Sequence, residues 1–197
     1  MDRTLYYYNT NAREYVNGTL HVDMTEIQNL FLGKITPMGK ILDFGCGSGR
    51  DALAFIEKGY SVDAIDGSPE LCRLASEILP VPVRKMYFHE LKAVDRYDGI
   101  WACASLLHLD AIEMKEVMFK MIKALKVNGV IYASFKFGDF IGVKGDRYYH
   151  NYTEESFRTF LEGFDSIGIE MSWMTTDVRE GCESEKWLNV ILRKTGL

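Results

Sequence analysis

Two short apolar segments that each end near an acid limit the possible folds of this chain more than any other feature does. The first is residues 40–44, which contain Asp43 and run into a turn with glycine at positions 45, 47 and 49. The second is residues 61–65, which Asp66 follows directly. This arrangement is typical of the first two parallel strands of a doubly wound α/β sheet, which binds a nucleoside at the carboxyl ends of its strands. Glycine lets a ligand lie against bare peptide, and Asp66 is placed to accept both hydroxyl groups of a ribose.

The glycine spacing indicates which nucleoside binds. A dinucleotide fingerprint reads G-x-G-x-x-G and seats a pyrophosphate on the next helix N-terminus. Here the third glycine, Gly49, comes one residue early, and Asp43 would repel a pyrophosphate. A carboxylate there suits the ammonium group of S-adenosylmethionine (SAM), which also carries a sulfonium. We therefore expect SAM, and a nicotinamide-dependent oxidoreductase is the rival interpretation.

Two later segments extend the pattern. Residues 97–109 resemble the fourth-strand motif of class I SAM-dependent methyltransferases. Residues 125–132 resemble that family's L-x-P-G-G turn into strand five, with Val127 and Asn128 in place of the proline and the first glycine. The matched region runs from about residue 6 to 135, and the rest is similar to small bacterial methyltransferases, including tellurite-resistance-type enzymes. The resemblance implies methyl transfer (EC 2.1.1.-) with S-adenosylhomocysteine (SAH) as product.

Hydrophobic periodicity and capping residues predict alternating strands and helices. Helices are expected at 9–16, 23–33, 50–58, from Ser68, at 110–125 and from Thr153 to Glu162. Strands are expected at 40–44, 61–65, 83–88, 97–102, 129–135, 167–174 and 186–193. Alternation of this kind requires a mostly parallel sheet with right-handed crossovers. With the resemblance, it predicts a Rossmann-like, doubly wound, seven-stranded sheet whose last strand is antiparallel.

Composition indicates one domain in a reducing compartment. The 197 residues are 47% hydrophobic, which suits a single core. The net charge of -5 and the lack of a basic stripe give no footprint for DNA. Cys46, Cys72, Cys103 and Cys182 form no C-x-x-C pair, which indicates free thiols. No signal peptide or membrane span is expected, which predicts a cytoplasmic protein. We also expect a monomer or homodimer, and no bound metal.

The domain is expected to have three functional parts: an N-terminal helical lid (1–35), a cofactor-binding core (36–135), and acceptor-side loops with closing strands (136–197). The resemblance places the methionine part of SAM near Asp43 and the glycine turn, its ribose on Asp66, and its ammonium near the carbonyl groups of Ala102 and Cys103. With no acid at the end of strand three before Glu90, the adenine is expected to rest on backbone and on Tyr87 or Phe88. The full set of expected cofactor residues is Tyr15, Asp43, Gly45, Cys46, Gly47, Asp66, Gly67, Ser68, Tyr87, Phe88, Ala102, Cys103 and Ser105.

The lid is expected to be the aromatic-rich start of the chain, with the Tyr15 hydroxyl directed at the carboxylate of SAM. A helix that packs on the sheet with tyrosines at its wet edge is the alternative for this segment.

Methyl transfer from a sulfonium requires alignment and exclusion of water, and a general base only if the acceptor arrives protonated. His108 and His150 are the candidate bases. The cations Lys136, Arg147 and Arg179 could surround an anionic acceptor. Each of these residues also has a purely structural interpretation, such as a core histidine or a surface ion pair, and none is identified as catalytic.

The acceptor itself is the least constrained part of the prediction. Residues 102–105 read Ala-Cys-Ala-Ser rather than the [DN]-P-P-[YF] of amino-methylating DNA enzymes. With no appended substrate domain, a small-molecule acceptor is expected. A tRNA or protein methyltransferase and a non-catalytic SAM-binding module are the alternatives.

Overall fold

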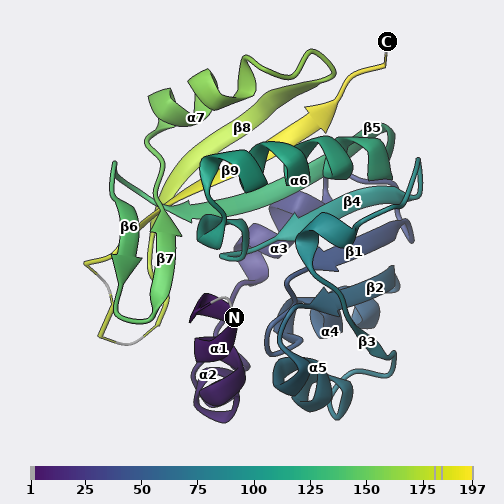
Figure 1. The fold of residues 1–197 in the computed structure, drawn as a ribbon. Coiled ribbons are helices and arrows are strands. Elements are labelled where there is room, and N and C mark those ends of the chain that lie inside the picture. The colour runs from purple at the N-terminus through teal and green to yellow at the C-terminus, as the bar shows by residue number, and fades with distance from the viewer. Residues whose placement is uncertain (1–2, 180, 183, 197) are drawn as a thin grey trace.

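A doubly wound sheet organises the molecule (Figure 1). The computed structural model describes residues 3–179, 181–182 and 184–196. Seven strands pair in the order β3-β2-β1-β4-β5-β9-β8. These strands are β1 (Lys40–Phe44), β2 (Ser61–Asp66), β3 (Val83–Lys85), β4 (Tyr97–Ala102), β5 (Leu125–Lys136), β8 (Ile167–Thr176) and β9 (Lys186–Lys194). Only β9 runs antiparallel to its neighbours, β5 and β8, so the predicted sheet with an antiparallel last strand is confirmed.

Helices cover both faces of this sheet. They are α1 (Arg3–Thr10), α2 (Ala12–Thr19), α3 (Thr25–Leu32), α4 (Arg50–Glu57), α5 (Pro69–Ser76), α6 (Ala111–Ala124) and α7 (Glu154–Leu161). Two 3-10 turns, η1 (Phe88–Glu90) and η2 (Leu106–His108), follow β3 and β4. The apolar faces of α6 and α7 pack on one face of the sheet, and those of α3 and α4 pack on the other. The sequence signals behind these helices are present as caps, since the Ser68 hydroxyl accepts the N–H of Leu71 and Asp110 accepts two N–H groups of α6.

The N-terminal segment differs from the predicted single helix over 9–16. It forms two helices, α1 and α2, which are broken at Asn11. Ala12 and Val16 of α2 pack against Leu71 and Leu74 of α5. Helix α1 also contacts α5, so both N-terminal helices pack on the helix that follows β2.

Strand β3 is shorter than the predicted 83–88. Its ladder ends at Lys85 because the chain turns into η1, where the Tyr87 N–H donates to Glu90 Oε2 over 2.8 Å. Tyr87 and Phe88 consequently leave the sheet and face the region beyond its carboxyl edge.

A β-hairpin between β5 and α7 is absent from the predicted elements. It consists of β6 (Ile141–Lys144) and β7 (Arg147–His150), with Gly145 at φ +61 in the turn. Figure 1 shows this hairpin beside the ends of β5, β8 and β9. It contacts α1 through β7, and Thr4 Oγ1 accepts the N–H of Tyr148 over 3.1 Å. The hairpin and α1 together close one side of the carboxyl edge.

Among the described residues, no helix is both long enough and apolar enough to cross a bilayer.

Candidate active site

Two adjoining cavities lie at the carboxyl edge of the sheet. The larger has a volume of about 760 Å³ and is lined by the glycine turn, the ends of β2 and β3, and helices α1 and α2. The smaller has a volume of about 140 Å³ and lies between α2, the end of β5 and the residues after β8. Four residues line both cavities: Tyr8, Tyr15, Ala104 and His108. A molecule in the larger cavity and one in the smaller cavity would therefore meet at these four residues.

The glycine turn brings bare backbone to the wall of the larger cavity. Gly45 and Gly47 have φ angles of +89 and +53, a conformation that favours glycine. A Cβ atom on Gly45 would lie 2.6 Å from Ser105 Cβ, and one on Gly47 would lie 2.9 Å from Tyr15 Cε1. The turn needs glycine both for its backbone angles and for the close approach of Ser105 and Tyr15.

Asp66 lies at the rim where β2 ends. Its Oδ2 accepts the N–H of Gly47 over 3.0 Å, and its Oδ1 accepts the N–H of Ser68 over 2.8 Å. Burial raises the pKa of this carboxyl, and the backbone N–H groups oppose the rise. Each oxygen keeps a second lone pair for a hydroxyl donor, so the predicted ribose contact is geometrically available.

Most of the expected cofactor residues line the larger cavity. Those that do are Tyr15, Gly45, Gly47, Asp66, Gly67, Tyr87, Phe88 and Ser105. The others lie elsewhere: Cys46 and Ala102 are buried, Ser68 caps α5, and Cys103 lines the smaller cavity. The ends of strands thus supply the wall largely through backbone and aromatic rings.

Asp43 is placed differently from the prediction. It is 2% exposed, lies on neither cavity wall, and accepts a hydrogen bond from the backbone of Ala52 at the start of α4. Burial holds its pKa well above the usual value, and the charge of Asp51 adds to this. Among the described residues, Asp43 Oδ2 has no hydrogen-bond partner. The side chain is thus anchored at the start of α4, and its contact with the methionine part of SAM stays a prediction.

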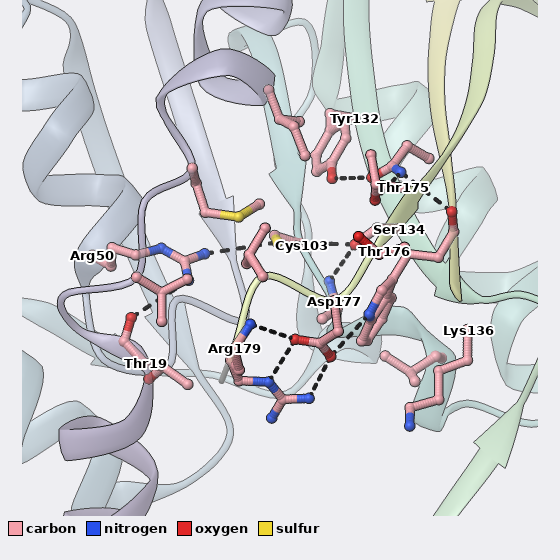
Figure 2. A pocket seen from close by; sticks show the side chains of 18 of the residues that line it. Thr19, Arg50, Cys103, Tyr132, Ser134, Lys136, Thr175, Thr176, Asp177 and Arg179 are labelled. Atoms are coloured by element: carbon pink, nitrogen blue, oxygen red, sulfur yellow. Dashed lines mark hydrogen bonds and ion pairs between the residues drawn. The ribbon is translucent and has the colours of Figure 1, made fainter. Parts of the chain in front are cut away.

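Carboxylates pair with three of the four cations that line the smaller cavity. Lys136 Nζ lies 2.6 Å from Glu185 Oε2, and Arg50 Nη2 lies 2.7 Å from Asp51 Oδ2. Figure 2 shows the third pair, in which Arg179 binds Asp177. These pairs orient the cations and neutralise most of their charge.

Arg147 is the fourth cation. Within the described part of the chain, no carboxylate lies within ion-pair distance of it. Its guanidinium instead lies over aromatic rings, 4.5 Å from the centroid of Tyr7 and 5.3 Å from that of Tyr149. Arg147 is thus the cation of this cavity that remains available to an anion.

Of the two candidate bases, the structure brings only His108 to the cavities. His108 Nε2 lies 2.8 Å from the Tyr8 hydroxyl, and Nδ1 lies 2.6 Å from the carbonyl oxygen of Tyr148. His150 lines neither cavity and stacks on Tyr152 at 4.5 Å. Burial lowers the pKa of His150. The structure thus gives His150 a packing role beside Tyr152.

The sequence analysis missed Arg50 and Tyr8. Arg50 follows Gly49 directly, and Asp51 binds it while its Nη2 lies 3.8 Å from Cys103 Sγ at the cavity wall (Figure 2). The signal for Arg50 was its place in the first turn after the glycines, where a long side chain returns toward the strand ends. No local signal distinguishes Tyr8 from Tyr6 and Tyr7, because the difference depends on how α1 is turned.

The residues of the larger cavity fit SAM. A cavity of this size falls within the usual range for small ligands, roughly 300–1,000 Å³. Bare peptide at the glycine turn accommodates the amino-acid part, Asp66 suits the ribose, and Tyr87 and Phe88 offer flat surfaces to a base. Among the described residues, no group of three or more potential metal ligands lies together.

Comparison with known proteins agrees with this arrangement. Residues 41–129 match a family model described as a methyltransferase domain. An uncharacterized methyltransferase of Staphylococcus carnosus (strain TM300) is 25% identical over 174 residues, covering 79% of this chain and 84% of the relative.

Solved structures share the fold at lower identity. A Burkholderia thailandensis 1,6-didemethyltoxoflavin-N1-methyltransferase, solved with 1,6-didemethyltoxoflavin and S-adenosylhomocysteine, has a TM-score of 0.77 at 22% identity, covering 97% of this chain and 85% of that one. The [4+2]-cyclase SpnF has a TM-score of 0.75 at 15% identity, covering 96% and 94%. None of these matches bears on the narrower resemblance to tellurite-resistance-type enzymes. With its acid–glycine–acid motif, its sheet order and these matches, the chain is similar to the class I SAM-dependent methyltransferases, and its residues 41–129 match a methyltransferase domain.

Proposed function

We propose that the methyl acceptor is a small molecule that enters the smaller cavity. The size of that cavity carries the proposal, since about 140 Å³ bounded by α2, β5, β7 and the segment after β8 suits a small group rather than a polymer. The Burkholderia enzyme, which is solved with a small substrate, provides a precedent on the same fold.

The larger cavity is the proposed SAM site, with Tyr15, Gly45, Gly47, Asp66, Gly67, Tyr87, Phe88 and Ser105 as its binding residues. SAM supplies an activated methyl group on its sulfonium. The protein then has to align the acceptor with that methyl group and exclude water. Helices α1 and α2 contribute to the walls of both cavities through Tyr8 and Tyr15, which supports a lid role for residues 1–35.

We further expect the acceptor to carry a single negative charge. Arg147 supports this, because ion pairs already occupy Arg50, Lys136 and Arg179. A carboxylate or phosphate on the acceptor would find in Arg147 a cation that is half-buried and held by rings. Neutral analogues of a good acceptor should be methylated with a higher KM.

The test is transfer of a radioactive methyl group from SAM into fractionated cell extract. The low-mass filtrate, the tRNA fraction and the protein fraction are incubated separately with the enzyme, with Asp66→Ala as the control for dependence on the SAM site. Label in the low-mass fraction supports the proposal. Label in tRNA or protein alone would replace it with one of those acceptors, and SAM binding without any transfer would favour a non-catalytic module.

A further inference from the structure

We propose that Tyr8 and His108 form a proton relay that deprotonates the acceptor as the methyl group is transferred. The inference rests on the proposed function in one respect, namely that the acceptor occupies the smaller cavity. Both residues line the two cavities, so they stand where donor and acceptor meet. Tyr8 is the new catalytic residue in this proposal, and His108 is the final proton acceptor.

The hydrogen bonds of His108 determine which of its nitrogens is a base. Nδ1 lies 2.6 Å from the carbonyl oxygen of Tyr148, and a carbonyl oxygen can only accept. Nδ1 therefore carries the proton, and Nε2 of the neutral ring is the unprotonated nitrogen that can accept a hydrogen bond. Nε2 lies 2.8 Å from the Tyr8 hydroxyl, so Tyr8 donates to it.

The surroundings of Tyr8 keep its hydroxyl protonated before the reaction, so it can transfer a proton but does not itself start as the base. Burial raises the pKa of Tyr8 to about 12, so the hydroxyl is protonated at neutral pH. Arg147 Nη1 lies 3.5 Å from the Tyr8 oxygen, where its charge opposes the rise and stabilises negative charge on that oxygen. The hydroxyl can thus receive a proton on one side as it gives its own to His108 on the other.

The backbone of a single residue, Tyr148, positions both members of the pair. The carbonyl of Tyr148 orients His108, and the N–H of the same residue donates to Thr4 Oγ1 on α1, one turn before Tyr8. The edge of the Tyr8 ring packs on His108, with centroids 5.4 Å apart. Elements that are remote in sequence therefore converge on this pair, which is the expected mark of a positioned functional group.

The relay defines the chemistry of the acceptor. A bond forms between the nucleophilic atom and the methyl carbon, the carbon–sulfur bond breaks, and its electron pair stays on sulfur. The proton of the nucleophile passes to the Tyr8 oxygen while the Tyr8 proton passes to His108 Nε2, which leaves an imidazolium to be deprotonated by solvent. The acceptor class is therefore a nucleophile that is protonated and uncharged at its reacting atom, such as a phenol, an enol or a ring N–H.

The first measurement needs no acceptor. Nitrogen-15 NMR of the SAH complex reports the tautomer of His108, and Tyr8→Phe is compared with Tyr7→Phe, whose ring is the neighbour of Tyr8 but lines neither cavity. We expect an Nδ1–H ring in the wild type and a changed Nε2 signal only in Tyr8→Phe. Calorimetry with SAH checks that both variants still bind SAH.

The second measurement uses a panel of small phenols and ring N–H compounds of graded acidity, together with any acceptor found in the low-mass fraction. Tyr8→Phe should lower kcat by about 10²–10⁴-fold, the usual effect of losing a general base. Its rate should recover as pH rises and the acceptor ionises in solution. A merely structural role for Tyr8 would not produce this pH-dependent recovery.

An Nε2–H tautomer in the SAH complex overturns the relay, whether or not any panel compound is methylated. So does a Tyr8→Phe variant whose rate and pH profile match those of Tyr7→Phe. Failure of the proposed function looks different, because label would then appear in tRNA or protein while the His108 tautomer stayed as expected.

Discussion

At the scale of single residues, neighbouring acids in similar sequence contexts have different roles. Asp66 faces a cavity and binds only backbone N–H groups, so its oxygens keep capacity for a ligand. Asp51 is buried and fully engaged by Gln28, Arg50 and Trp101. The hydrogen-bond partners of each carboxylate therefore decide which of the two acids can bind a ligand.

Asp66→Ala should weaken SAH binding by ~1–3 kcal/mol, because a charge-assisted hydrogen bond to the ribose would be lost. Asp63→Ala is the matched control, since Asp63 lies on the same strand but pairs with Lys40 and Arg96 away from the cavities. Calorimetry with SAH measures both. Equal affinity in Asp66→Ala and wild type would refute the ribose assignment.

His150 should make stability depend on pH. Burial lowers its pKa in the folded protein, whereas the unfolded chain keeps a value of about 6.5. The unfolded state therefore binds the proton first, so this contribution is intact above about pH 6.5 and is lost as pH falls through the lowered pKa. Urea denaturation at about pH 7.5 and about pH 5.5 should show a smaller loss for His150→Phe than for wild type. The exposed His21→Asn variant should lose as much stability between the two pH values as wild type does. If His150→Phe also loses as much as wild type, His150 is not the source of this pH dependence.

At the scale of elements, local sequence signals predicted the helix over 110–125, which the structure contains as α6 (Ala111–Ala124). Met114, Val117, Met118 and Met121 recur at helical spacing and are buried in the core, so this apolar face of α6 packs against the sheet. The helix begins with a capping box between Asp110 and Glu113. Its position was predictable because periodicity and capping are local properties.

Asp110→Ala should lower the free energy of unfolding by about 1 kcal/mol, the usual effect of losing an N-cap. The Asp110 side chain accepts the N–H groups of Ile112 and Glu113, both at 2.8 Å. Chemical denaturation measures the loss, with the exposed Asp165→Ala as control. Glu113, Glu116 and Val117 of α6 line the larger cavity, so calorimetry with SAH reports whether loss of the cap also disturbs the site.

At the scale of the whole molecule, the site is assembled from parts that meet only in the folded chain. Helix α1, the turn η2 and the hairpin strand β7 bring Tyr8, His108 and Arg147 together. Asn9 fixes α1 to the start of α5, where its side chain accepts the N–H of Glu70 over 3.1 Å. A ligand that touches these parts at once should stabilise the whole fold.

Saturation with SAH at one hundred times its Kd should raise the free energy of unfolding by about 2.7 kcal/mol, as mass action requires for a ligand of the folded state. Thermal or chemical denaturation with and without SAH measures this gain. Asp66→Ala at the same SAH concentration should gain less. NADH, which has a pyrophosphate, should give no gain, and stabilisation by NADH would contradict SAM specificity.

The sequence by itself determined the sheet, most of its helices and the donor end of the site. Glycine spacing, strand-end acids, periodicity and caps depend on neighbouring residues, and they predicted the confirmed sheet with its antiparallel last strand. The tertiary structure decided the acceptor end. It placed Asp43 on neither cavity wall and stacked His150 on Tyr152, and it made Tyr8, rather than Tyr6 or Tyr7, the residue that lines both cavities. These outcomes depend on how distant elements pack and which partners they supply, and no local pattern encodes that.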